Sequence, residues 1–249
     1  MFRRQKAPKA EQEEKTPYTL YNPHSLDQSK RVWNSDYYQV ISVDPAYRNF
    51  GLRIERRHTD GRIIPLVFLR ANLAINITKD SPELLSTAIR SASDLLDELS
   101  HFFQDCHLVI IERQLHENYK SLRVSQHVLT YFLIKMKDMP LLPTILEINS
   151  KLKTQELGAP KGLNKNQIKE WSVLKARQLL EWRDDKDSLK IMNQGKRKQD
   201  DLADCVCMIE ALFSLWGLPI TQEPSPIPII DKKLVLNVKS EPLKLKISG

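Results

Sequence analysis

The sequence predicts an α/β fold in which a mixed five-stranded sheet carries helices on both faces. Two patterns lead to this prediction. Short apolar, β-branched segments alternate with longer segments whose apolar residues recur at three- and four-residue steps. The first three predicted strands follow one another through short turns, as in an antiparallel meander, and later strands alternate with helices, as in parallel additions. No run of 18 apolar residues occurs, so no membrane span is predicted.

The meander begins with an apolar run that ends on Asp44, where Pro45 cannot continue a hydrogen-bonded ladder. The second strand alternates apolar residues with Gly51, Arg53 and Glu55, which is typical of a half-buried strand. A hairpin signal, Thr-Asp-Gly, then leads into the third strand. The expected strands are 37–44, 49–57 and 62–70.

Helices and strands alternate in the rest of the domain. Ser81-Pro82-Glu83 marks a helix start, with an N-cap, a proline at the first helical position and an acid in the first turn. The run before Glu112 is too short for a helix and indicates a fully buried strand. The expected elements are helix 82–103, strand 107–111, helix 117–137, strand 143–149, helix 167–182 and helix 199–216.

Two terminal regions fall outside this pattern. Residues 1–34 are polar, charged and without periodicity, which predicts a disordered arm. Residues 218–249 form a proline-rich tail, so the folded domain is expected over 35–217. Within the domain, glycines and a proline predict that 151–165 is loop at least in part, and 183–198 is expected to be irregular and mobile.

The positive charge is concentrated in one segment. Residues 151–198 hold 13 Lys and Arg against 6 Asp and Glu, a net charge of +7 that equals that of the whole chain. A confined basic region favours a polyanionic partner, most simply nucleic acid, and a solvated surface is the alternative. The candidate nucleic-acid-binding residues are Lys151, Lys153, Lys161, Lys165, Lys169, Lys175, Lys196, Arg197 and Lys198.

The three cysteines show no zinc-binding spacing. Cys205 and Cys207 lie on different faces of a predicted helix, as reduced core thiols would. The basic N-terminus is not followed by an apolar segment, so it does not resemble a secretory signal. An intracellular location is therefore expected.

Acidic residues from three remote elements form the candidate chemistry. Asp44 and Glu112 each end a predicted strand, and Asp204 lies three and four residues after Asp201 and Asp200 on one helix. The helix dipole explains Asp200 or Asp201, but not Asp204 further along. Stacked carboxylates favour Mg²⁺ or Mn²⁺ over zinc, and two such ions about 4 Å apart can promote phosphodiester hydrolysis.

Three motifs resemble those of the RuvC-like Holliday junction resolvases, a branch of the ribonuclease H fold. They are Val-Asp-Pro-Ala-Tyr-Arg-Asn-Phe-Gly at 43–51, Ile-Ile-Glu-Arg-Gln at 110–114 and Lys-Gln-Asp-Asp-Leu-Ala-Asp-Cys at 198–205. The resemblance covers about residues 37–216. It is strongest to the poxvirus-type resolvases of large DNA viruses, with the fungal mitochondrial resolvases next.

The resemblance implies a ribonuclease H-like nuclease domain and a dimeric endonuclease that resolves four-way DNA junctions. The implied ligands of two Mg²⁺ or Mn²⁺ ions are Asp44, Glu112, Asp201 and Asp204. Asp200 is either an accessory acid or the ligand in place of Asp201. Lys153 matches a lysine near the scissile phosphate in this family, and Lys151 competes for that role. If the protein is viral, it would act where viral DNA replicates in the host cell, or in the virion.

One residue departs from the family pattern. Ala46 stands where the family has glycine, and alanine tolerates a type I turn but not a positive φ. The alternatives are a related nuclease for other branched DNA or hybrids, and a non-catalytic nucleic-acid-binding protein. A sugar-kinase or actin-like ATPase is disfavoured, because the seven glycines form no phosphate-binding loop.

Overall fold

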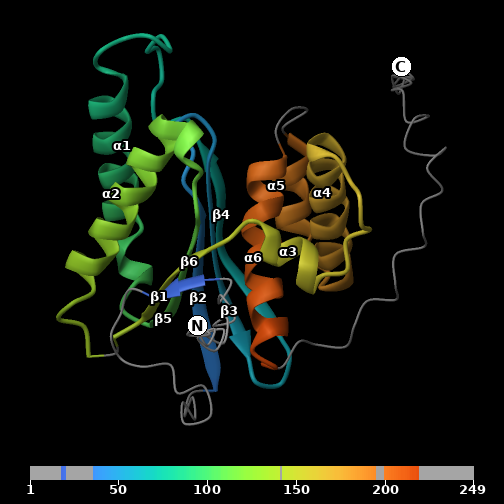
Figure 1. Ribbon diagram of the computed structural model, residues 1–249. Helices are drawn as coiled ribbons and strands as arrows, with labels where there is room; N and C mark the ends of the chain where they lie inside the picture. The colour runs from blue at the N-terminus through green and yellow to red at the C-terminus, as the bar shows by residue number, and fades with distance from the viewer. Residues whose placement is uncertain (1–17, 21–35, 141, 195–198, 219–249) are drawn as a thin grey trace, which may run out of the picture.

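The computed structural model describes residues 18–20, 36–140, 142–194 and 199–218. They form a six-stranded sheet in the order β1-β6-β5-β2-β3-β4. Helices α1 and α2 cover one face, and α3, α4, α5 and α6 lie on the other (Figure 1). The strands are β1 (Tyr18–Leu20), β2 (Tyr37–Asp44), β3 (Phe50–His58), β4 (Ile63–Ala71), β5 (Cys106–Glu112) and β6 (Thr144–Ile148). The helices are α1 (Leu84–Glu98), α2 (Tyr119–Lys135), α3 (Lys151–Glu156), α4 (Lys165–Trp182), α5 (Lys186–Gln194) and α6 (Asp200–Leu215).

The predicted five-stranded mixed sheet is confirmed. Strands β2, β3 and β4 form the antiparallel meander, and β5 and β6 add in parallel beside β2. Strands β2 and β5 are buried along nearly their full length, as expected for strands covered on both faces. Their parallel register pairs Val43 with Ile111, so Asp44 and Glu112 leave the sheet side by side.

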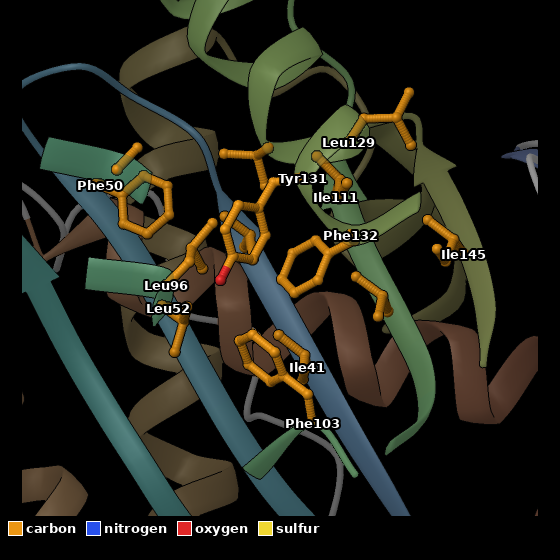
Figure 2. Packing of buried hydrophobic residues seen from close by; sticks show 14 of the residues in the cluster. Ile41, Phe50, Leu52, Leu96, Phe103, Ile111, Leu129, Tyr131, Phe132 and Ile145 are labelled. Carbon is orange, nitrogen blue, oxygen red and sulfur yellow. The ribbon is translucent and has the colours of Figure 1, made fainter. Parts of the chain in front are cut away.

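Apolar packing fixes both faces of the sheet. On one face, Ile41, Phe103, Tyr131 and Phe132 belong to the large cluster between the sheet and helices α1 and α2 (Figure 2). The Phe103 and Phe132 rings meet edge to face, with centroids 5.3 Å apart. On the other face, α6 packs through two clusters, one against the central strands and one against α4 and α5. Helix α6 is therefore held from both sides.

A buried ionic network also lies on the α6 face. Arg53 and Arg57 of β3 both donate to Glu55, which is fully buried. Arg53 reaches Asp185 in the turn between α4 and α5 at 2.9 Å, and Arg57 reaches Glu210 of α6 at 2.7 Å. The network joins the sheet, the α4–α5 turn and α6.

The prediction of a disordered arm over 1–34 is wrong for Tyr18–Leu20. These residues form β1, which pairs antiparallel with β6 at the outer edge of the sheet. The local sequence of residues 18–20 does not predict a strand, and pairing with the edge of β6 stabilises it. The remaining arm, 1–17 and 21–35, and the tail from residue 219 lie outside the described residues.

Two segments in which loop or irregular structure was predicted also contain helices. The prediction that 151–165 is loop in part is confirmed over residues 157–164. Helix α3 occupies the start of the predicted 151–165 loop, and its residue Leu152 is buried. The Asn149 side chain accepts a hydrogen bond from the Lys151 amide at 3.0 Å. Helix α5 occupies much of 183–198. The Asp185 carboxylate accepts from the Ser188 amide at 3.0 Å, and Met192 is fully buried.

Two predicted helices are shorter than expected. Helix α1 ends at Glu98, and the rest of the predicted 82–103 segment includes a 3₁₀ turn at Ser100–Phe102. Helix α2 is preceded by a 3₁₀ turn at His116–Asn118. Within the described part of the chain, no helix combines the length and apolarity needed to cross a membrane.

Candidate functional site

Three acidic side chains meet at the carboxyl edge of the central strands. Asp44 ends β2, Glu112 ends β5, and Asp204 lies in the second turn of α6. One carboxylate oxygen from each lies within 4.8 Å of the other two. Asp44 and Glu112 are only 6% and 7% exposed. The structure thus brings together acids that are 68 and 92 residues apart in the sequence.

Gly51 allows α6 to reach this edge. In the β2–β3 pairing, Gly51 lies opposite Asp44. A Cβ atom at Gly51 would lie 2.7 Å from the carbonyl oxygen of Asp201 and 3.2 Å from the Cys205 Sγ atom. Such contacts are too close, so only glycine permits the first turn of α6 to lie against β3.

The turn after Asp44 does not require glycine. The amide of Ala46 donates to the Asp44 carbonyl at 3.0 Å. Among the described non-glycine residues, positive φ occurs only at Asn76 and Asp184, so Ala46 has a conformation open to any residue. The Asp44 carboxylate also accepts a long hydrogen bond, 3.4 Å, from Gln114. The alanine at position 46 therefore leaves Asp44 in place.

A buried lysine joins the acids. Lys153 of α3 is 4% exposed, and its Nζ atom lies 3.4 Å from Glu112 Oε1 and forms an ion pair with Asp204 Oδ2. Lys151 begins the same helix, but its side chain is exposed to solvent. Of the two lysines considered from the sequence, the fold brings Lys153 into the acidic cluster and leaves Lys151 outside it.

The cluster carries more negative charge than Lys153 can balance. Burial, then the charges of Glu112, Asp204 and Asp201, raise the pKa of Asp44 well above its usual range, against the opposing effect of Lys153. Burial raises the pKa of Asp204 to about 6, with Lys153 opposing and Glu112 adding to the increase. Burial alone would lower the pKa of Lys153, but the charges of Asp204 and Glu112 outweigh it and raise the pKa.

These residues fit a divalent cation. The Oδ1 atom of Asp204 is buried and has no hydrogen-bond partner among the described residues, so it keeps its lone pairs for a ligand. The donors are all carboxylate oxygens, the type that Mg²⁺ and Mn²⁺ prefer. A cation here would also offset the repulsion that raises the acid pKa values.

The two neighbouring acids of α6 have different surroundings. Asp201 lies outside the group of three, but its charge contributes to the raised pKa of Asp44. Asp200 forms an ion pair with Lys169 of α4. Asp201 therefore acts on the centre of the site, whereas Asp200 is held at its rim.

The remaining predicted basic residues lie around α4 or outside the described chain. Lys161 and Lys165 are exposed before and at the start of α4, Lys169 is exposed one turn later, and Lys175 is partly buried. Lys196, Arg197 and Lys198 are outside the described residues. The sequence did not reveal the pairing of Lys169 with Asp200, because the two residues meet only when α4 packs on α6. The predicted reduced core thiols are confirmed, since all three cysteines are free and buried.

Comparison with known proteins gives viral relatives. No protein-family model matches this sequence. The chain is 34% identical over 119 residues to the uncharacterized protein 97L of Invertebrate iridescent virus 3, covering 47% of this chain and 53% of that protein. It is 28% identical over 138 residues to the uncharacterized protein 170L of Invertebrate iridescent virus 6, covering 49% and 56%. The chain thus spans about half the length of the curated relatives it matches.

Among solved structures, the chain is similar to the yeast mitochondrial Holliday junction resolvase Ydc2. The TM-score is 0.52 at 18% identity, over 75% of this chain and 85% of the yeast chain. The two proteins share a fold. It is a ribonuclease H-like mixed sheet with helices on both faces, as the sequence predicted. A structure of Thermus thermophilus RuvC with a Holliday junction substrate has a TM-score of 0.47 at 14% identity, over 73% and 97% of the two chains.

Proposed function

We propose that this protein is a Mg²⁺- or Mn²⁺-dependent endonuclease that cuts branched DNA, with the four-way junction as its preferred substrate. The observation that carries the proposal is the convergence of Asp44, Glu112 and Asp204 around buried Lys153 in a resolvase fold. Both curated relatives are viral proteins, so branched DNA formed during viral replication in an infected cell would be a source of substrate.

Each residue of the site has a role in this proposal. Asp44, Glu112, Asp204 and Asp201 would hold the ions. Bound ions of this kind activate water and stabilise the leaving oxygen of a phosphodiester. Lys153 keeps its proton and presents a positive charge where the phosphate gains negative charge.

Two copies of the chain fit the proposed substrate. A four-way junction presents strands in symmetric pairs, and a homodimer would place one active site on each strand of a pair. Exposed lysines around the site would contact the DNA backbone without reading the base sequence.

The test is cleavage of a labelled four-way junction with and without Mg²⁺. Asp44→Asn is expected to lose cleavage by at least about 100-fold while junction binding is retained, because the carboxylate holds the ions rather than the DNA. Asp60→Asn is the matched control, because Asp60 is exposed in the β3–β4 turn. Full activity of Asp44→Asn would refute the assignment.

Competition experiments define the substrate. Unlabelled flaps, bulged loops and RNA–DNA hybrids should displace the labelled junction less effectively than an unlabelled junction does. If a flap or hybrid is cut faster, the protein is a nuclease for another structure. If DNA is bound but never nicked with either metal, the protein is a binding protein.

A further inference from the structure

Lys169 and Asp200 form an ion pair that bridges two helices at the rim of the acidic site. The Lys169 Nζ atom donates to Asp200 Oδ2, which joins the beginning of α4 to the first residue of α6. The Lys169 side chain is 52% exposed and that of Asp200 is 16% exposed. Ala176 and Leu179 of α4 belong to the same apolar cluster as Leu202 and Val206 of α6, so apolar packing also joins the two helices.

Lys169 belongs electrostatically to the active site. Partial burial lowers its pKa, but the hydrogen bond and charge of Asp200, with the charges of Asp201 and Asp204, outweigh this effect and raise it. Both lysines are therefore affected by the charge of Asp204. Lys153 is enclosed among the central acids, and Lys169 is open to the solvent from which a substrate would arrive.

Lys169 can exchange its partner Asp200 for another anion at little cost. The Lys169 side chain is 52% exposed, so water solvates its ammonium group when the pair opens. Asp200 is the first residue of α6, where the positive end of the helix dipole stabilises a carboxylate without help from a lysine. A DNA phosphate would offer Lys169 an equivalent charge-assisted hydrogen bond.

We propose that Lys169 and Asp200 form an exchangeable ion pair, in which Lys169 leaves Asp200 to bind a backbone phosphate next to the scissile one. Asp200 then competes with DNA for the same ammonium group and is not a metal ligand. This inference rests on the proposed function, because it requires that DNA enter the site.

The proposal predicts opposite effects for the two partners. Lys169→Ala removes a phosphate contact, so it should weaken binding about threefold to tenfold and lower the slope of log affinity against log salt by about one. Asp200→Asn removes the competitor and a repulsive charge, so it should strengthen binding about twofold to fivefold. Binding of a fluorescein-labelled four-way junction would be measured with Ca²⁺ in place of Mg²⁺, and thermal melts would verify folding.

The Lys135–Asp97 pair provides a matched control. Its atoms are 2.8 Å apart and its side chains are 47% and 54% exposed, but Lys135 ends α2, whereas the site lies beyond the start of that helix. The 17 residues of α2 extend about 25 Å. Lys135→Ala and Asp97→Asn should each change binding less than about twofold.

The outcomes separate this inference from the function on which it rests. If both Lys169→Ala and Asp200→Asn weaken binding, the pair is a structural link between helices and the inference is wrong. Lys169→Arg should keep most of the wild-type affinity, since it retains the charge. A folded wild-type protein that binds no branched DNA would refute the proposed function, and this inference with it.

Discussion

The Asp204 carboxylate is largely buried, but only one of its two oxygens has a partner among the described residues. Lys153 pairs with Oδ2, and Oδ1 has no hydrogen bond within the described part of the chain. Burying a charge is costly unless it is fully paired, so ionised Asp204 is tolerated poorly until a cation is present. The residue that the helix dipole could not explain in the sequence is therefore one whose charge the fold leaves incompletely compensated.

Asp204→Asn is expected to stabilise the metal-free protein at pH 7.5. The pKa of Asp204 is raised to about 6 in the folded state, so its contribution to stability is full below the unfolded pKa of about 3.9 and is lost as the pH rises through 6. At pH 7.5 the gain should be on the order of 2 kcal/mol. Urea unfolding in EDTA at pH 4 and pH 7.5 measures it.

With Mg²⁺ present, the wild-type protein should be more stable than Asp204→Asn. Mg²⁺ is expected to stabilise the wild-type protein and to have little effect on Asp204→Asn, because the variant lacks a ligand. An asparagine variant that is equally destabilised at both pH values would show that Asp204 is a structural residue.

At the residue scale, the sequence predicted the three central acids but not the choice between neighbours. Lys151 and Lys153 are two positions apart, and on a helix this separation places them on nearly opposite faces. Because helix α3 was not predicted, the preference for Lys153 rested on the resemblance alone and not on local geometry. Asp200 and Asp201 differ by one position, and only the packing of α4 on α6 separates their surroundings.

At the scale of elements, α6 can lie close to β3 because residue 51 is glycine. Gly51→Ala would place a Cβ atom 2.7 Å from the backbone of Asp201, so α6 must move and carry Asp201 and Asp204 with it. We expect cleavage to fall by at least about tenfold and stability to fall by about 1–3 kcal/mol. Single-turnover cleavage and urea unfolding measure the two effects.

A double variant shows which of the two close contacts impairs Gly51→Ala. Cys205→Ala would remove the Sγ contact at 3.2 Å but leave the contact with the Asp201 carbonyl. Gly51→Ala with Cys205→Ala should therefore remain impaired in cleavage. Recovery of activity in the double variant would show that the cysteine, not the helix backbone, determines the spacing.

Elements with strong local patterns were predicted, and those that depend on partners were not. The buried strands β2 and β5 carry continuous apolar runs and were located to within a residue or two. Helix α5 is mostly polar in sequence, and it depends on the hydrogen bond from the Ser188 amide to Asp185 and on burial of Met192 in an apolar cluster formed with β4, α4 and α6. These are tertiary contacts, so the local sequence pattern cannot predict them.

At the scale of the whole molecule, the ionic network on the α6 face adds links between β3, the α4–α5 turn and α6. Glu55 is its centre and contacts Arg53, Arg57 and Arg183. Burial would raise the pKa of Glu55, but the charges of Arg57, Arg53 and Arg183 outweigh burial and lower it. Its contribution to stability is therefore present above the unfolded pKa of about 4.3 and is lost as the pH falls.

Glu55→Gln is expected to destabilise the protein by about 3–5 kcal/mol, because it leaves buried guanidinium groups uncompensated. Mg²⁺ should not restore this loss, since the network lies outside the acidic cluster. Urea unfolding at pH 7 with and without Mg²⁺ measures the effect. A loss below about 1 kcal/mol would show that water replaces Glu55.

The pairing of β1 with β6 has a consequence for self-association. An uncovered strand presents unpaired amide and carbonyl groups, which invite strands from other molecules. Removing residues 1–20 should leave junction cleavage per folded molecule unchanged but increase aggregation, measured by light scattering against concentration. Unchanged scattering would mean that the rim of the sheet is shielded in another way. If scattering does increase, the pairing of residues 18–20 with β6 sets the protein concentration at which aggregation begins.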